Sequence, residues 1–180
     1  MIVFVDFEAS SLAKQSYPIE IAWVFADGRS RSFLIKPDPK WTDWSVEAES
    51  IHGISRERLE TEGVAVATIT NEMIDTLSGH DLYASAPSWD GKWMSVLLRA
   101  GGRPRHSLRL KKSDQAFSHA ARDCLGPAAP EGEVEKLVRQ VIQDTEPAFP
   151  AHRALPDALL ELHRWKRIRE EADKRLLRGQ

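Results

Sequence analysis

The sequence predicts an α/β fold in which helices cover the faces of a mixed β-sheet. Two patterns lead to this prediction. The first 36 residues hold three short apolar segments rich in β-branched side chains, with a turn signal between the last two, which is typical of an antiparallel meander. The remaining chain alternates segments of helical periodicity with shorter strand-like runs, and this alternation is typical of a sheet flanked by helices.

Three strands are expected at the start of the chain. Residues 2–5 form a continuous apolar run, which indicates a buried central strand. Residues 19–25 form a second strand, and the pair Asp27 and Gly28 that follows is a hairpin turn signal. Residues 32–35 then form the third strand. These three segments therefore predict the antiparallel part of the sheet.

The rest of the chain is expected to be mostly helical. Residues 41–63 are mixed and acidic, which favours short helices and loops. Apolar side chains recur at helical spacing further on, and Pro156 suits the first position of the last helix. The expected helices are 67–78, 93–99, 113–124, 133–145 and 156–177, and the two further strands are 82–84 and 108–110.

Length and composition are those of an ordinary globular protein. The chain has 180 residues, 42% apolar and 29% charged, with 25 Lys+Arg and 27 Asp+Glu and a formal net charge of -2. We expect one domain over residues 1–180, with residues 166–180 as a charged helical tail, that buries roughly 70% of its unfolded surface. Disordered and fibrous chains are excluded. A single cysteine, Cys124, excludes an intramolecular disulfide and argues against a structural zinc site.

The sequence also indicates the cellular compartment of the protein. The N-terminal residues lack the basic start and the apolar stretch of a signal peptide. No apolar run approaches the ~18 residues that a membrane span needs. We therefore expect a cytoplasmic protein without a membrane partner.

Two carboxylates lie at the end of the first strand. Asp6 and Glu8 are two residues apart, so their side chains point to the same face of the strand. Neighbouring carboxylates beside a buried apolar run repel each other and are costly to desolvate. Either they emerge into solvent where the strand ends, or a hard divalent cation neutralises them.

Three further polar residues are candidates for the same site. Asp90 follows the fourth strand, where an aspartate is commonly a turn or cap residue, but it approaches Asp6 if the first and fourth strands are neighbours. Asp157 lies in the first turn of the last helix, where the helix dipole favours its charged form. His152 precedes that helix as a surface residue or, beside metal-bound carboxylates, as a group that takes a proton from water.

Taken together and in this order, the motifs resemble those of the DEDDh, or DnaQ-like, group of 3'→5' exonucleases. Residues 5–8 (Val-Asp-Phe-Glu) match the first motif of that family, residues 88–90 (Ser-Trp-Asp) the second, and residues 152–158, with their His-x4-Asp spacing, the third. Residues 51–55 (Ile-His-Gly-Ile-Ser) resemble the His-Gly-Ile segment that precedes the second motif. The resemblance covers roughly residues 1–165.

The sequence departs from the family pattern near the substrate side of these motifs. Phe7 and Ala9 stand where threonine is common, and Trp89 stands where phenylalanine is frequent. The asparagine that often precedes the second motif is absent. None of these differences removes a carboxylate or the histidine.

The resemblance implies a fold, an activity and a cofactor. The fold is a ribonuclease-H-like sheet of three antiparallel strands extended by parallel strands. The activity is hydrolysis of DNA or RNA from the 3' end with release of nucleoside monophosphates. Two Mg²⁺ or Mn²⁺ ions, ~3.5–4 Å apart, would activate the attacking water and stabilise the leaving 3' oxygen. The implied metal ligands are Asp6 (bridging), Glu8, Asp90 and Asp157, and the implied general base is His152.

The expected partners are nucleic-acid 3' ends, single-stranded or frayed, and a homodimer through the last helix stays open. The expected substrate contacts are Phe7, Leu12, His52, Trp89, Trp93 and Arg153, although core packing is the stronger expectation for the tryptophans. Residues 99–112 carry six Lys/Arg, His106 and no acid. Such a segment suits a polyanion or forms a solvated face.

Two other classes of protein were weighed. Paired carboxylates also serve glycosidases, but that function leaves His152 and the basic segments unexplained. A ribonuclease-H-like module that binds nucleic acid or protein without cutting would have lost a carboxylate or the histidine, and this sequence keeps all five. Metal-dependent hydrolysis separates the exonuclease from the inactive module.

Overall fold

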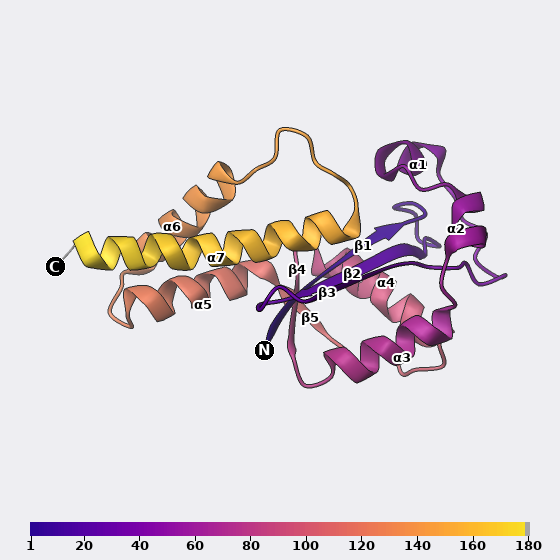
Figure 1. Ribbon diagram of the computed structural model, residues 1–180, viewed down its shortest axis with the longest axis horizontal. Coiled ribbons are helices and arrows are strands. Elements are labelled where there is room, and N and C mark those ends of the chain that lie inside the picture. Colours follow the sequence, from indigo (N-terminus) through magenta and orange to yellow (C-terminus); the bar gives the residue numbers. More distant parts are fainter. Residues whose placement is uncertain (179–180) are drawn as a thin grey trace.

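The computed structural model describes residues 1–178, which form a five-stranded mixed sheet flanked by helices (Figure 1). The strand order is β3-β2-β1-β4-β5. β1 and β3 pair antiparallel with β2, whereas β4 runs parallel to β1 and β5 parallel to β4. The strands are β1 (Ile2–Ala9), β2 (Pro18–Phe25), β3 (Ser30–Leu34), β4 (Asp81–Ala84) and β5 (Leu110–Lys112). The predicted antiparallel meander extended by parallel strands is therefore confirmed.

The helices lie between β3 and β4, between β4 and β5, and after β5 in the sequence. Two short helices occupy the acidic segment for which short helices and loops were expected. The helices are α1 (Val46–His52), α2 (Arg56–Glu62), α3 (Val66–Leu77), α4 (Pro87–Ala100), α5 (Ser113–Leu125), α6 (Glu131–Asp144) and α7 (Ala154–Arg178). None of the helices in residues 1–178 is both long and apolar enough to cross a membrane.

The alternation of side chains along β1 divides the core into two layers. Val3, Val5 and Phe7 belong to one buried cluster, together with side chains of α3 and α4. Phe4 belongs to the other, with side chains of α5, α6 and α7. Because strand side chains alternate between faces, Asp6 and Glu8 continue the row of Phe4. Both carboxylates therefore lie on the face that α7 covers.

Helix α4 begins earlier than the sequence predicts. Its first residue is Pro87, six positions before the expected start at Trp93. Proline is favoured at the first helical position because its missing N–H has no intrahelical partner there. Asp90 is consequently a helical residue in the first turn of α4 rather than a turn residue between elements.

Other boundaries also differ from the prediction, and β1 extends to Ala9, four residues beyond its expected end at Val5, so that Asp6 and Glu8 are strand residues. α7 begins at Ala154, so Pro156 is its third residue, which is tolerated because the first four N–H groups of a helix lack intrahelical partners. β5 begins at Leu110 instead of Leu108. The Leu108 side chain is buried in the cluster beneath α3 and α4, but its backbone does not pair with β4. The apolar character of Leu108 therefore reflects burial of its side chain and not membership of a strand.

The charged end of α7 packs on the rest of the molecule. The helix extends to Arg178, and its Ile168 and Ala172 side chains are fully buried in the cluster formed with α5 and α6. The tail expected over residues 166–180 is therefore helical as far as it is described, and residues 179–180 lie outside the described part.

Candidate active site

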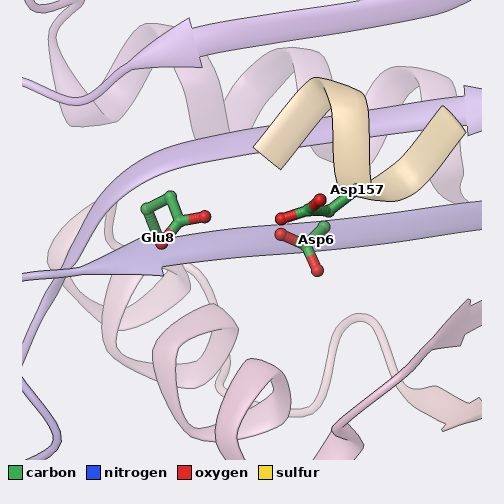
Figure 2. Close-up of side chains that lie close together, drawn as sticks. All are labelled: Asp6, Glu8 and Asp157. Carbon is green, nitrogen blue, oxygen red and sulfur yellow. The ribbon is translucent and has the colours of Figure 1, made fainter. Parts of the chain in front are cut away.

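Three carboxylates converge between β1 and the first turn of α7. Asp6, Glu8 and Asp157 each offer an oxygen atom that lies within 4.8 Å of the other two. Figure 2 shows the carboxylates of Asp6 and Asp157 facing each other, with Glu8 beside them along the strand. Two oxygen ligands of one divalent cation lie at most ~4–5 Å apart, given bond lengths of ~2.0–2.6 Å. The spacing of these carboxylates suits such an ion.

Small side chains bring α7 close enough to β1 for this contact. Ala154 and Ala158 are one helical turn apart and are both fully buried. Asp157 lies between them in the sequence, in the first turn of the helix. A larger side chain at either alanine would hold the helix away from the sheet and separate Asp157 from Asp6.

Asp90 approaches the same place from α4. Its side chain is 2% exposed, and its carboxylate accepts hydrogen bonds from the backbone N–H groups of Ala86, at 3.3 Å, and Phe7. These bonds fix Asp90 beside β1. It does not join the group of three mutually close oxygens, but its charge acts on Asp6 and Glu8.

Burial and mutual repulsion shift the protonation of these acids. Burial, reinforced by the charges of Asp90 and Glu8, raises the pKa of Asp6 well above its usual value. Burial and the charge of Asp157 raise the pKa of Glu8 to about 8. Burial likewise raises the pKa of Asp90 to about 7. A bound cation would reverse these shifts, because an adjacent opposite charge favours the ionised form.

His152 lies immediately before α7, at the edge of this cluster. Burial raises the pKa of Asp157, and the charge of His152 partly offsets that increase, so the imidazole is within electrostatic range of the carboxylate. His152 is exposed, and its backbone has a φ of 47°. A residue other than glycine rarely adopts this conformation, and such residues concentrate at functional sites.

Sequence reasoning missed Glu20, which anchors the segment that carries His152. Glu20 lies opposite Glu8 in the pairing of β1 with β2 and is 3% exposed. Arg153 donates two hydrogen bonds to its carboxylate, at 3.0 and 2.6 Å, and the N–H of Ala154 donates a third at 2.9 Å. Glu20 therefore caps the start of α7. A lone charged residue within the apolar run of β2 was the available signal.

Glu161 is a second acid that the sequence analysis did not select. It lies one helical turn after Asp157 and is 7% exposed. Its charge contributes to the raised pKa of Asp6 and of Asp90, so it faces the site. The Arg164 guanidinium donates a hydrogen bond to it at 3.0 Å. The four-residue spacing from Asp157 could have identified it.

Two of the expected substrate contacts are exposed beside the site. Leu12, in the loop after β1, is 70% exposed, and Trp89, in the first turn of α4, is 38% exposed. The Trp89 ring stacks on Trp93 with centroids 5.7 Å apart. Lys92 donates hydrogen bonds to the backbone of Ala13 and the hydroxyl of Ser16, which fixes this loop against α4.

The other expected contacts are engaged within the protein. Phe7 and Trp93 are buried in the core, and the indole N–H of Trp93 donates to the Ser16 hydroxyl at 3.0 Å. His52 is also buried, and its Nδ1 accepts a hydrogen bond from the N–H of Ile54 at 3.1 Å. The guanidinium of Arg153 is bound by Glu20. These residues shape the site from within, and a direct contact with substrate stays a prediction for them.

Comparison with known proteins identifies solved structures that share this fold. No family model matches the sequence, and no curated protein matches it. Among solved structures, the zinc-bound complex of Escherichia coli exonuclease I with single-stranded DNA superposes with a TM-score of 0.68 and 15% identity over 99% of this chain. Exonuclease I of Methylocaldum szegediense gives 0.65 and 16% identity over 97% of this chain.

A third similar structure comes from an RNA enzyme. A 3'-exonuclease that recognises the 3' end of the histone mRNA stem-loop gives a TM-score of 0.65 and 12% identity, covering 96% of this chain and 64% of its own. The present chain spans only 42% of the Escherichia coli exonuclease I chain and 41% of the Methylocaldum one. At these identities the likeness shows the fold alone, which is the ribonuclease-H-like fold that the resemblance of the sequence motifs implied.

The raised pKa values predict that the metal-free protein loses stability as the pH rises. The folded state binds protons more tightly than the unfolded chain at Asp6, Glu8 and Asp90. Their contribution is complete below pH ~4 and is lost as the pH rises through about 7 to 8. Thermal unfolding in EDTA should therefore show a falling midpoint between pH 5 and pH 8.

Addition of 10 mM Mg²⁺ should restore the midpoint at pH 8 more than at pH 5, because the cation binds the ionised carboxylates. The Asp6→Asn variant should gain a few degrees in EDTA at pH 8, since 1 kcal/mol corresponds to about 2–4 °C in a domain of this size. A midpoint in EDTA that rises from pH 5 to pH 8 would contradict this account of the site.

Loss of the ion pair between Glu20 and the partly exposed Arg153 should destabilise the fold. Glu20→Gln removes the anion that Arg153 and the N–H of Ala154 bind and is expected to lower the free energy of unfolding by roughly 1–3 kcal/mol. Glu62→Gln is the matched control, because its pair with Arg58 is exposed on α2 and contributes about 0–1 kcal/mol. Urea unfolding measures both changes. Equal losses in the two variants would show that Glu20 does not anchor α7.

Proposed function

We propose that this chain is a metal-dependent 3'→5' exonuclease that releases nucleoside monophosphates from DNA or RNA. The observation that carries the proposal is the group of mutually close carboxylates of Asp6, Glu8 and Asp157, with Asp90 and His152 beside it. The ribonuclease-H-like fold supports it, because the similar structures are those of exonucleases, bound to single-stranded DNA or specific for an RNA 3' end.

The donor set fits hard divalent cations. Four carboxylates offer only oxygen ligands, which Mg²⁺ and Mn²⁺ prefer, and their buried positions disfavour negative charge unless a cation compensates it. We assign the binding of two such ions to Asp6, Glu8, Asp90 and Asp157. When bound, they would lower the pKa of the attacking water and stabilise the leaving 3' oxygen.

His152 supplies the base in this proposal. Its exposed imidazole beside Asp157 is placed to accept a proton from the attacking water, a role that contributes typically 10²–10⁴-fold to a rate. The bond from Arg153 to Glu20 holds the adjacent backbone, which limits the motion of the imidazole relative to the carboxylates.

The exposed side chains beside the site provide a place for the terminal base. Trp89 presents a partly exposed ring that stacks on Trp93 and has the Lys92 ammonium 5.1 Å from its centroid, and Leu12 presents an apolar side chain. Aromatic stacking is worth about 1–3 kcal/mol per base and tolerates any sequence. A single-stranded or frayed 3' end, whose bases are unstacked, suits these side chains better than a closed duplex end.

The proposal predicts a ladder that shortens from the 3' end. With 5'-labelled single-stranded DNA and RNA, the wild type should shorten the strand in Mg²⁺ or Mn²⁺ and not in EDTA. His152→Ala should lower the rate at least 100-fold, because it removes the proton acceptor. Asp157→Asn should abolish the reaction, because it removes a metal ligand.

His119→Ala is the matched control, since His119 is an exposed histidine on α5, and it should keep the wild-type rate. A wild type that binds the oligonucleotides and Mn²⁺ but shortens neither strand would overturn the proposal in favour of an inactive binding module. Equal rates for His152→Ala and the wild type would remove His152 from the mechanism.

A further inference from the structure

A groove lined by basic side chains runs along α4, next to the face that carries Asp90. It encloses about 340 Å³ between the helix, at Pro87, Gly91 and Ser95, and the segment of residues 105–110 that leads into β5. Arg105, His106 and Arg109 are exposed and contribute to its wall. We call this feature, with these residues, the α4 groove.

The charge of the α4 groove is not compensated by acids. Its neighbours in the same basic segment are paired, Lys111 with Asp81 and Lys112 with Asp114. Among residues 1–178, by contrast, Arg109 has neither an ion pair nor a hydrogen-bond partner, and Arg105 donates only to His106, at 2.8 Å. No carboxylate of the described chain lines the groove. Concave surfaces lined by one sign of charge focus the field and attract polyanions.

The groove and the candidate active site are linked by the first turn of α4. Pro87, at one end of the groove, and Asp90 share the first turn of α4. From Pro87 to Ser95 the helix axis extends about 12 Å. Phosphates of a B-form strand are spaced ~3.4 Å along the axis, and more widely in an extended strand, so this length accommodates two or three of them.

We propose that the α4 groove binds the sugar–phosphate backbone of the nucleic-acid strand whose 3' end enters the carboxylate site. The guanidinium groups of Arg105 and Arg109 contact phosphates, for which their planar donor geometry is well suited. The proposal rests on the proposed exonuclease function for the placement of the 3' end. It adds the path of the strand beyond the terminal nucleotide, and it gives a role to Arg105 and Arg109 of the basic segment.

Binding without cleavage tests the groove. Anisotropy of a 5'-fluorescein-labelled dT20 strand is measured in EDTA for the wild type and for the double variant Arg105→Ala/Arg109→Ala. Loss of two phosphate contacts should raise Kd roughly tenfold at 50 mM salt. The slope of log K against log salt should become shallower by about 1.4, from ~0.7 per phosphate contact on a single strand.

The matched control removes the same charge elsewhere. Lys136 and Arg139 are exposed on α6 and, within residues 1–178, have no ion-pair partner. Lys136→Ala/Arg139→Ala should keep the wild-type Kd and salt slope. Unchanged binding by the groove variant, or an equal loss in both variants, would overturn the proposal. Thermal unfolding checks that all four substituted side chains are dispensable for folding.

The binding test of the α4 groove can succeed or fail independently of the test for exonuclease activity. A wild type that binds dT20 through Arg105 and Arg109 but never shortens it would keep the groove and reject the exonuclease. A wild type that shortens dT20 in Mg²⁺, with a groove variant that binds dT20 equally well, would keep the exonuclease and reject the groove.

Discussion

Burial of closely spaced carboxylates at the end of β1 is the constraint on which the rest of this structure depends. Asp6 and Glu8 share a face of the strand, and Asp157 and Asp90 are brought against them by α7 and α4. Burial of these groups without compensation costs free energy, which is visible as a raised pKa at each of them, and the charges of neighbouring acids add to the shifts of Asp6 and Glu8. Binding of a divalent cation, as proposed above, would compensate this cost.

Two partly buried arginines, Arg153 and Arg164, hold this unfavourable cluster in place. The loop of residues 145–153, which carries His152, is anchored at both ends. Arg164 binds Glu146 at 2.5 Å and the hydroxyl of Thr145 at 3.2 Å, and at the other end Arg153 binds Glu20. Because Arg164 also binds Glu161 in α7, the two ends of the loop are tied to the elements that present the carboxylates. The proposed base and the proposed metal ligands are thereby held in fixed positions relative to one another.

The sequence was sufficient to predict the sheet and the residues of the three motifs. The apolar run before Asp6 predicts β1, and the period of two places Asp6 and Glu8 on one face. It was insufficient for Glu20 and Glu161, because their roles depend on partners that only the fold brings together, such as Arg153, 133 positions from Glu20. Local periodicity also cannot distinguish a leucine that is only buried from one whose backbone pairs with a neighbouring strand. The predicted start of β5, at Leu108, is therefore two residues too early.

A calorimetric titration with Mn²⁺ at pH 7.5 tests the central claim most directly, because it measures cation binding by the carboxylates without requiring a substrate. The account predicts two ions per chain and release of protons, seen as a heat that depends on the buffer, since ions displace protons from groups with raised pKa values. Asp6→Asn should abolish the high-affinity heat, and Asp114→Asn, an exposed acid of α5, should not. Absence of binding at millimolar Mn²⁺, or an Asp6→Asn variant that binds like the wild type, would contradict it.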